Sequence, residues 1–400
     1  MTGVHALDAM NALAAAMQTA FGPFLAVALG AHGWSPAQIG VALSISTIAV
    51  LVSQLPAGAF VDAARDPRAP ARMAVLGLGL ALLVLAVWPR PGPVFVAMAL
   101  QGVSSSLLGP AIAATSLALV GRAALGERLG RNARYASIGN GLAAAMIGLV
   151  GGMLATGTVM VAVAVLALPA LFAVSQIRNG FDHHHPAAPD RQTVRQEITA
   201  LLRNPHLTIF AFCVGAFQLA NAAMLPLAAA GLSRAHVKDT ELIVAVAIVM
   251  PQIVVALCAP AIGRYAETHG RRPLLLLGWG SVPVQGLLLA LLPTPWLLPG
   301  VQMISGIGAA VLGVMLPLVA ADLSHGTRRF TLCLSALNLP IAIGATLSTT
   351  LSGFFADRFG DIAAFLGLGL AGASGLMLLW LAMPETRPVL ISPMAPEPAR

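Results

Sequence analysis

Long apolar runs separated by short polar segments make up most of this chain. A helix needs about 20 apolar residues to cross the hydrocarbon core of a bilayer. Most of the runs reach that length, and Gly, Pro, Arg or Asp residues bound them. The pattern predicts an all-α polytopic membrane protein with twelve transmembrane helices, at 9–30, 38–61, 72–88, 93–121, 134–154, 157–176, 206–230, 241–265, 273–292, 296–321, 330–355 and 362–383.

The longest polar interruption separates the sixth and seventh predicted helices and contains Pro186 and Pro189. Such a segment is typical of a linker between domains. The proline-containing end of the chain after Pro384 predicts a disordered tail. The predicted units are an N-terminal six-helix half at 1–177, a cytoplasmic linker at 178–205, a C-terminal six-helix half at 206–384 and a cytoplasmic tail at 385–400.

The composition agrees with a membrane location. The chain has 400 residues, of which 58% are hydrophobic and 9% charged, and its mean hydropathy is +0.86. Soluble domains have about 25% charged residues, so this chain cannot cover a water-facing surface. Cys213, Cys258 and Cys333 each lie in an apolar run, which favours packed, reduced thiols over a disulfide framework.

The net charge of +7 does not indicate nucleic acid, because the basic residues form no single stripe. Eighteen of the 22 Lys and Arg residues fall in the linker, in the tail and in the loops after even-numbered helices. Only Arg90, Arg234, Lys238 and Arg358 fall on the other side. Basic residues concentrate on the cytoplasmic side of membrane proteins. We therefore expect a multi-pass protein of the inner (cell) membrane with both termini in the cytoplasm.

The two predicted halves repeat one another at a spacing of 203 to 205 residues. The matching pairs are Gln18 and Pro23 with Asn221 and Pro226, Gly58 and Asp62 with Gly263 and Glu267, and Gly102 and Gly109 with Gly306 and Gly313. Parallel repeats of this kind occur in secondary transporters, where the solute site lies between the repeats near the middle of the membrane. The prolines are expected to bend or locally open the first and seventh helices, either as static shaping or as moving parts.

The chain resembles the major facilitator superfamily of secondary transporters over nearly its whole length. The family's loop signature is Gly, three residues, an acid, two residues, Gly and two basic residues. Gly263, Glu267, Gly270, Arg271 and Arg272 fit it, whereas the first copy keeps only Gly58 and Asp62 and has Arg65 at the second Gly position. Phe21-Gly22-Pro23-Phe24 and Trp34-Ser35-Pro36 are similar to segments of bacterial members that are described only as general transporters.

The resemblance implies a gate at the cytoplasmic ends of the helices. Asp62 and Glu267 would accept hydrogen bonds there from an arginine or from the start of a neighbouring helix. The residues assigned to gating are Gly58, Asp62, Arg65, Gly263, Glu267, Arg271 and Arg272. The alternative is that the arginines only set the topology.

Two departures weaken an assignment as a proton–drug antiporter. Members of that type carry an Arg three residues before a Gln-Gly pair in the fourth helix, and here Met98 precedes Gln101-Gly102. They also carry a Gly-Pro element in the fifth helix, where this chain has Leu149 in place of the proline.

Polar residues within the predicted helices are candidates for the solute cavity, because unpaired polar groups are costly in lipid. By resemblance, helices 1, 4, 7 and 10 line that cavity, and helices 5 and 11 contribute to it. The candidates are Asn11, Gln18, Gln101, Ser104, Ser105, Asn140, Gln218, Asn221, Gln302 and Asn338. Each is neutral, which suits a neutral or amphipathic solute. Hydrogen bonding between helices is the alternative role for each.

Acidic residues are absent from the middle of the predicted helices. Proton-coupled carriers need a titratable group that changes environment between states. Asp8 and Asp322 are the two candidates near the cavity helices, although Asp322 is expected to pair with Arg328 or Arg329. The coupling ion therefore stays open between protons and none, and facilitated diffusion is an alternative.

No phosphate-binding loop or hydrolase motif occurs, so we expect neither an enzyme nor a cofactor. His183-His184-His185 lies in the polar linker with no further ligand set, and we interpret it as a solvated loop and not as a metal site. The expected function is transport of a small organic solute, with export as the leading version. Uptake of a nutrient or metal chelate, and a transporter-like scaffold or receptor, are the alternatives. The expected partners are the solute and the lipid bilayer, with protons as one of the two alternatives for coupling and with no nucleic acid, and the protein is expected to be a monomer.

Overall fold

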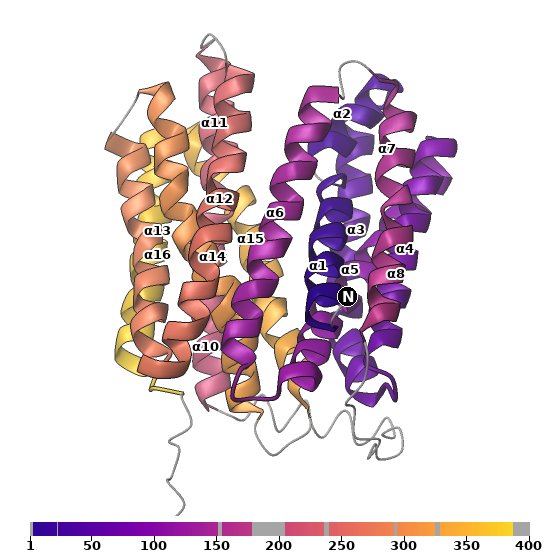
Figure 1. The fold of residues 1–400 in the computed structure, drawn as a ribbon. Coiled ribbons are helices and arrows are strands. Elements are labelled where there is room, and N and C mark those ends of the chain that lie inside the picture. Colours follow the sequence, from indigo (N-terminus) through magenta and orange to yellow (C-terminus); the bar gives the residue numbers. More distant parts are fainter. Residues whose placement is uncertain are drawn as a thin grey trace, which may run out of the picture.

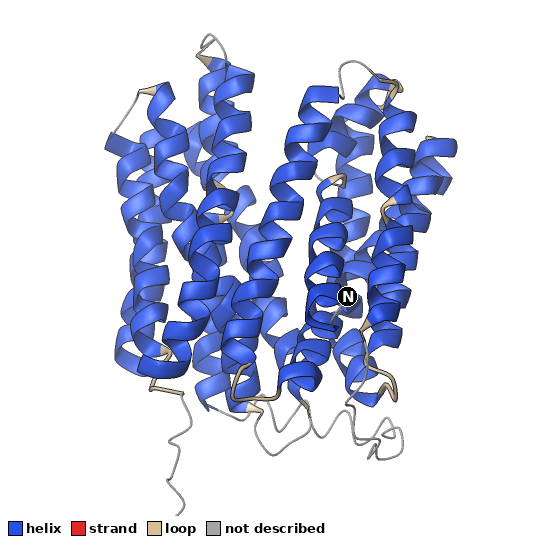
Figure 2. Cartoon of the chain, viewed as in Figure 1, coloured by secondary structure: helices blue, strands red, loops and turns tan. Residues whose placement is uncertain are grey.

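The computed structural model describes residues 3–21, 23–150, 154–177, 205–235, 240–291, 294–324 and 329–386. All the regular structure in these ranges is helical (Figure 2). The N-terminal half comprises α1 (Gly3–Thr19), α2 (Pro23–Ala31), α3 (Pro36–Ala63), α4 (Arg68–Val87), α5 (Pro91–Val120), α6 (Leu125–Val150), α7 (Thr156–Val165) and α8 (Ala167–Gln176). The C-terminal half comprises α10 (Pro205–Asn221), α11 (Met224–Arg234), α12 (Thr240–His269), α13 (Arg272–Leu291), η1 (Pro295–Leu297), α14 (Leu298–Leu323), α15 (Phe330–Phe359) and α16 (Asp361–Ala382).

Three of the twelve predicted helices are interrupted, each just before a proline. Pro23, Pro169 and Pro226 have no backbone N–H to bond the carbonyl four residues earlier. Those carbonyls belong to Thr19, Val165 and Ala222, and α1, α7 and α10 end at or next to them. The breaks before Pro23 and Pro226 agree with expectation. The break before Pro169 was not predicted, and Pro110, Pro317 and Pro340 lie inside uninterrupted helices.

Two helices begin at least six residues earlier than the sequence pattern predicted. The first begins at Gly3 instead of residue 9, and α6 begins at Leu125 instead of residue 134. Asp8, Arg128 and Arg131 are therefore helical residues, which corrects their predicted position at a helix end or in a loop. Charged residues are costly in a buried helix unless they are paired, and these three form ion pairs with one another, as described below.

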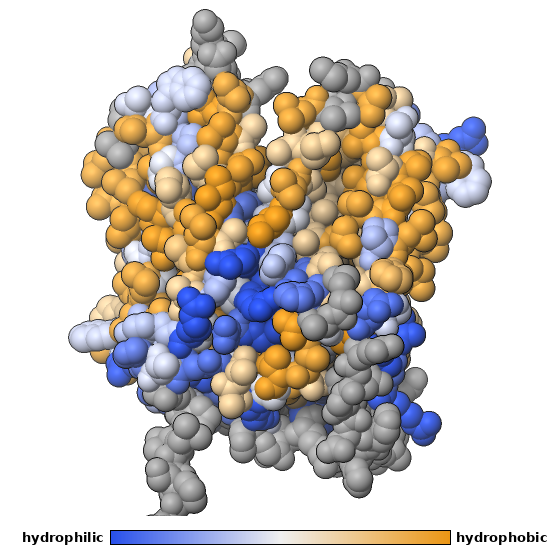
Figure 3. Space-filling model, in the orientation of Figure 1, coloured by the Kyte–Doolittle hydropathy of each residue, from blue (hydrophilic) through white to orange (hydrophobic). Residues whose placement is uncertain are grey.

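Ten helical segments of the described residues are long and apolar enough to cross a membrane. The two predicted spans outside this set are α1–α2 and α6. Helix α6 carries Arg128, Arg131 and Arg134, which lower its mean hydropathy. Large apolar side chains are widely exposed, among them Val52 at 73% and Leu149 at 71%. Figure 3 shows this apolar surface and a hydrophilic patch over the lower part of α6. A surface of this kind fits a lipid environment.

The helices form two side-by-side groups that correspond to the two halves (Figure 1). The main buried apolar cluster of the C-terminal half also takes Ala113, Leu125 and Leu129 from α5 and α6. These residues lie toward the end of the bundle where α8 ends and α10 begins, which we call the linker face. The halves therefore share packing near the linker face. At the opposite end, the molecular surface is hollowed between the two groups (Figure 3).

Candidate functional site

The carboxylate of Asp62 binds the first turn of α15 in the other half. Its Oδ1 accepts a hydrogen bond from the backbone N–H of Thr331 at 3.1 Å, and its Oδ2 accepts one from Leu332 at 2.9 Å. The first N–H groups of a helix have no partner within the helix and form the positive end of its dipole. Thr331 Oγ1 also donates to the carbonyl of Gly58 at 2.7 Å. The end of α3 is thus bonded to the start of α15.

Glu267 makes the reciprocal contact from the C-terminal half. Its Oε1 accepts a hydrogen bond from the backbone N–H of Glu127 at 3.1 Å, in the first turn of α6. Glu267 and Asp62 are 205 residues apart, and so are Leu332 and Glu127. Each half therefore presents one carboxylate to the start of a helix in the other half. Of the two donors considered from the sequence, arginine or helix start, these contacts use the helix start.

Glycines allow close backbone approach beside both carboxylates. A Cβ atom on Gly263 would collide with the carbonyl oxygen of Gly126 and lie 3.2 Å from Cα of Glu127. A Cβ atom on Gly58 would lie 2.7 Å from the carbonyl oxygen of Thr331. These positions leave no room for any side chain while the two halves are in contact.

Two arginines add hydrogen bonds between the halves. Arg122 Nη1 donates to the carbonyl of Ala321 at 2.6 Å, and Arg134 Nε donates to the carbonyl of Ala256 at 2.8 Å. Together with the two carboxylates, they close the space between the halves toward the linker face.

The remaining predicted gating residues bind within their own half or lie at the surface. Arg65 is exposed. Arg271 pairs through Nε with Asp322 Oδ2 at 3.1 Å, and both side chains are less than 10% exposed. Asp322 thus has a partner, Arg271, that was not expected from the sequence. Arg328, one of its two expected partners, lies outside the described residues.

Glu385 holds the start of α13. Its carboxylate accepts hydrogen bonds from the backbone N–H groups of Arg271 at 2.8 Å and Arg272 at 3.0 Å. Thr386 Oγ1 donates to Asp322 at 3.4 Å. The ordered chain thus extends into the segment predicted as a tail. Sequence reasoning missed Glu385 because its partners lie more than 100 residues away.

The turn between α3 and α4 is held by Asp66. This carboxylate pairs with Arg68 at 2.9 Å and with Arg72 at 2.5 Å. Burial by itself raises the pKa of Asp66, but the hydrogen bonds and positive charges of the two arginines outweigh it and lower this pKa below its ordinary value. The turn next to Asp62 is therefore an ion-paired structure at neutral pH.

Polar side chains of α1, α5 and α6 meet inside the N-terminal half. Gln18 Nε2 donates to Ser105 Oγ at 3.2 Å, and Gln101 Nε2 donates to the same oxygen at 2.9 Å. The residue after Gln18, Thr19, donates through Oγ1 to Asn140 Oδ1 at 3.1 Å. The structure thus brings together four of the predicted cavity residues.

The C-terminal half contains the equivalent of the Gln18 contact. Ser305 Oγ donates to Asn221 Oδ1 at 3.3 Å, which joins α14 to α10. Asn221 and Gln18 are repeat partners, and both are half-buried. Two neutral polar contacts therefore occupy matching places beside the breaks in α1–α2 and α10–α11.

The other predicted cavity residues lie apart from these contacts. Ser104 is buried against Gly77 of α4, Asn338 donates to Leu334 of its own helix at 3.1 Å, and Gln218 is half-buried on α10. Gln302 is 2% exposed, and its Nε2 has no hydrogen-bond partner in the part of the chain that is described. Asn11 belongs to a charged cluster.

That charged cluster joins α1 to α6 and contains Asp8, Asn11, Ser116, Arg128, Arg131 and Asn132. The Asp8 carboxylate pairs with Arg128 Nη2 and with Arg131 Nη2, each at 2.5 Å. Asp8 is 3% exposed and Arg128 is 2% exposed, whereas the Arg131 side chain is 32% exposed. Sequence reasoning named Asp8 but missed its partners, although Arg128, Arg131 and Asn132 share one helical face at the i, i+3, i+4 spacing.

Asn132 completes the cluster. Its Oδ1 accepts from Arg128 Nη2 at 2.6 Å and from Asn11 Nδ2 at 3.2 Å, and its Nδ2 donates to Ser116 Oγ at 2.7 Å. Arg128 also donates to the carbonyl of Val4 at 3.3 Å. The buried polar atoms of the cluster are thus linked across three helices.

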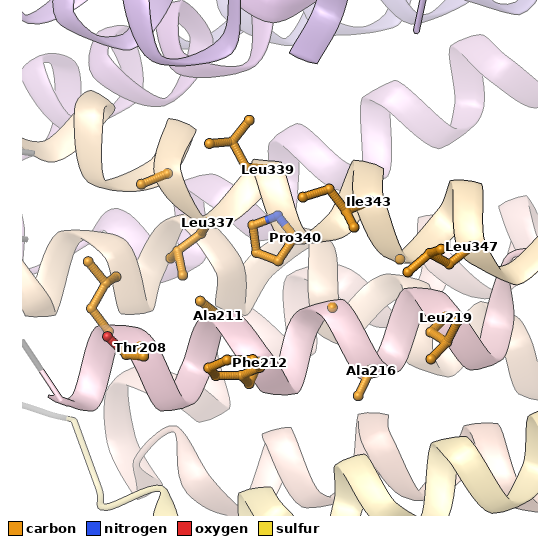
Figure 4. A pocket seen from close by; sticks show the side chains of 14 residues that line it. Thr208, Ala211, Phe212, Ala216, Leu219, Leu337, Leu339, Pro340, Ile343 and Leu347 are labelled. Atoms are coloured by element: carbon orange, nitrogen blue, oxygen red, sulfur yellow. The ribbon is translucent and has the colours of Figure 1, made fainter. Parts of the chain in front are cut away.

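The matching corner of the C-terminal half is apolar. There α10 packs on α15 around a cavity of about 640 Å³ that opens between exposed side chains such as Phe212 and Ile343 (Figure 4). Its wall includes Ala211, Ala336 and Leu337, the repeat partners of Asp8, Arg131 and Asn132. The repeat partner of Arg128 is the buried Cys333. The repeat therefore has charged residues in one half and uncharged residues at the matching positions of the other.

Among the described residues, no group of three or more His, Cys, Asp or Glu side chains is placed to hold a metal ion. His183-His184-His185 lies outside those residues.

Two halves related by a sequence repeat, built from helices of membrane length, are typical of secondary transporters. A family model described as Major Facilitator Superfamily matches residues 7–238 and 219–399. Two proteins described as uncharacterized MFS-type transporters, from Mycobacterium tuberculosis strains CDC 1551 and H37Rv, are each 34% identical over 396 residues. Each match covers 96% of this chain and 93% of the relative. The chain belongs to the Major Facilitator Superfamily.

The fold also matches a solved structure, that of the human organic anion transporter MFSD10 (TETRAN). The TM-score is 0.71, and the match covers 94% of this chain and 98% of that one. The sequences are 12% identical, so this likeness concerns the fold alone.

Proposed function

We propose that the protein exports a small organic solute across the inner membrane by alternating access. The carrying observation is the reciprocal capping by Asp62 and Glu267, which joins the two halves at the linker face. The distribution of Lys and Arg supports a cytoplasmic position for that face, for the linker and for both termini. The moving units would be residues 1–177 and 206–384, joined by the linker at 178–205 and followed by the tail at 385–400.

In this proposal, the described conformation is the one closed to the cytoplasm. Asp62 and Glu267 stabilise it by capping helix starts, and Gly58 and Gly263 permit the contact. Opening would break both caps at once, because the halves move as bodies. Arg65, Arg271 and Arg272 would act at the same face, the latter two by fixing the turn after Glu267.

The proposed solute is neutral or amphipathic. The polar contacts of Gln18 with Ser105 and of Asn221 with Ser305 are neutral, and each could exchange its partner for a solute hydroxyl, amide or carbonyl group. Their matching positions on α1 and α10 support a site shared by the two halves.

The direct test is the accumulation of a panel of labelled small solutes in cells that overproduce the protein, with and without a protonophore. If the cells accumulate less of a solute than control cells do, and the protonophore removes this difference, proton-driven export is supported. Higher accumulation would indicate uptake, and insensitivity to the protonophore would indicate facilitated diffusion. If purified protein in liposomes binds a solute but shows no flux, a receptor or scaffold replaces the transporter proposal.

Replacing Gln18 or Asn221 by Ala is expected to weaken the apparent affinity for a transported solute by roughly 2- to 13-fold each. This is the loss of one hydrogen bond worth about 0.5–1.5 kcal/mol. Flux in liposomes at varied solute concentration measures it. Ser374→Ala is the matched control, because Ser374 is exposed and bonds only to Ala371 of its own helix among the hydrogen bonds described. Unchanged affinity in both variants would remove these residues from the site.

A further inference from the structure

One edge of the contact between α6 and α12 carries Arg131, Arg134 and Tyr135, and we call this edge the outer seam. The three side chains share one face of α6 at the i, i+3, i+4 spacing, and Ile138, which is 37% exposed, continues that face. Arg131 pairs with Asp8, and its side chain is 32% exposed. Arg134 pairs with no acid among the described residues. A charge without a counter-ion at membrane depth indicates a functional site.

The other half of the protein holds Arg134 in place. Pro260 of α12 has no backbone N–H, so the carbonyl of Ala256, four residues earlier, has no partner within its helix. Arg134 Nε donates to that carbonyl at 2.8 Å. The two Nη groups of Arg134 and the hydroxyl of the half-buried Tyr135 make no hydrogen bond to a described residue. The guanidinium group is therefore fixed with two of its donor groups unused.

Helix α6 has one positive charge more than its nearby acids can neutralise. Its ionised side chains are those of Glu127, Arg128, Arg131 and Arg134, and Asp8 of α1 is the acid that pairs with this helix. Three cations and two acids leave a net charge of +1. A phosphate diester carries one negative charge, and a guanidinium group has the planar geometry that binds its oxygens in pairs.

The fold does not require polar side chains at the outer seam. At the repeat spacing of 205 residues, the partners of Arg131, Arg134 and Tyr135 are Ala336, Leu339 and Pro340 of α15. All three partners line the apolar cavity between α10 and α15. The same helix of the other half is thus built without donors at these positions, which favours a binding role for the donors of α6.

The outer seam lies where the exposed surface changes from polar to apolar. Further along α6, Leu142 is 63% exposed and Leu149 is 71% exposed. On α12, Leu257 is 68% exposed and directly follows Ala256, the partner of Arg134. Figure 3 shows the hydrophilic patch over the lower part of α6 next to apolar surface. Basic residues at such a boundary lie within reach of lipid headgroups.

We propose that the outer seam is a binding site for the phosphate group of an anionic phospholipid. The Nη groups of Arg134 and the unbonded Nη1 of Arg131 donate to the phosphate oxygens, and the Tyr135 hydroxyl donates one further hydrogen bond. The acyl chains lie along Leu142 and Leu257. A lipid with net negative charge is preferred over a zwitterionic one, because the site carries one surplus positive charge. The site does not depend on the direction of transport or on the solute.

The experiment measures lipid binding to the purified full chain by native mass spectrometry. Dioleoyl phosphatidylglycerol and dioleoyl phosphatidylcholine have the same acyl chains but differ in net charge, and each is titrated separately. We expect the first lipid to bind roughly tenfold more tightly. Arg134→Gln is expected to weaken its binding about fivefold and Tyr135→Phe about threefold, with no change for phosphatidylcholine. Arg134→Lys keeps the charge without the planar fork and is expected to give an intermediate loss.

Arg65→Gln is the matched control, because Arg65 is an exposed arginine at the linker face outside the outer seam. General attraction of anionic lipid to basic residues would make its effect equal to that of Arg134→Gln, and that result overturns the proposal. Equal binding of the two lipids by the wild-type protein overturns it as well. Tyr135→Phe keeps the contact with Ala256 intact, so it tests the site even if Arg134→Gln does not fold, and unchanged binding in this variant removes the hydroxyl from the site.

Inorganic phosphate, added in competition with phosphatidylglycerol, distinguishes a lipid from a soluble ligand. We expect it to leave the bound lipid in place at equal concentration, because the acyl chains contribute to binding. Displacement of the lipid at equal concentration would show that the outer seam binds soluble phosphates, which overturns the assignment to a phospholipid.

Discussion

Replacing Asp62 by Asn is expected to shift the protein toward the state that is open at the linker face by about 2 kcal/mol, roughly thirtyfold in the population ratio. The carboxylate accepts two backbone hydrogen bonds at the positive end of α15. An amide loses the charge, and its NH2 group would face one of the two N–H donors. Spin labels on Cys introduced at Ala123 and Arg264, which are exposed on opposite halves at the linker face, measure the shift after Cys213, Cys258 and Cys333 are replaced by Ser. Chemical labelling of cysteines introduced at the linker face measures it independently in membranes.

Asp357→Asn is the matched control for this substitution. Asp357 is an exposed carboxylate near the other end of the same helix, α15, and its loss removes the same charge. We expect no change in the label distances for this variant. In the double variant Asp62→Asn/Glu267→Gln, the shift in the free energy between the closed and open states is expected to be the sum of the two single shifts. The reason is that the two caps have no shared partner. A wild-type distance distribution in Asp62→Asn would show that this cap does not hold the gate.

The helix pattern and the repeat could be read from the sequence because both are local or periodic properties. Apolar runs of membrane length need no knowledge of neighbours. A Gly-x-x-x-acid motif occurs once in each half at one repeat spacing, as Gly58 with Asp62 and as Gly263 with Glu267. The recurrence identifies it as part of the repeat. Their use as helix caps follows from chemistry that any carboxylate shares near a helix start.

The partners of Asp8 and the start of α6 could not be predicted in this way. A charged residue at the edge of an apolar run is assigned to a loop, because its burial is costly unless it is paired. The partner of Asp8 lies 120 residues away on α6, and no local pattern joins the two. The same reason explains why Asp322 was matched to nearby arginines instead of Arg271. Whether these charged residues are buried depends on ion pairs with residues far away in the sequence, and such pairs are visible only in the folded structure.

Replacing Gly263 by Ala is expected to have the largest effect on the gate. The added Cβ atom would collide with the carbonyl oxygen of Gly126, which is backbone and cannot turn aside. Overpacking of this kind destabilises a packed contact by up to about 3 kcal/mol, which corresponds to a roughly 150-fold lower ratio of closed to open protein. The halves avoid the cost by staying apart at the linker face, so we expect the closed distance to disappear and alternating transport to stop.

Gly313→Ala is the control, because it adds the same atom in the same half against the same helix. Its Cβ atom would lie 3.8 Å from Cβ of Ala133, an ordinary contact between the halves. Both substitutions raise helix propensity equally, by up to about 1 kcal/mol, so propensity cannot separate them. The distance between labels at positions 123 and 264, together with solute flux, decides the comparison. A closed population in Gly263→Ala equal to that in Gly313→Ala would mean that α6 and α12 do not need this approach, and that the caps alone bring the halves together.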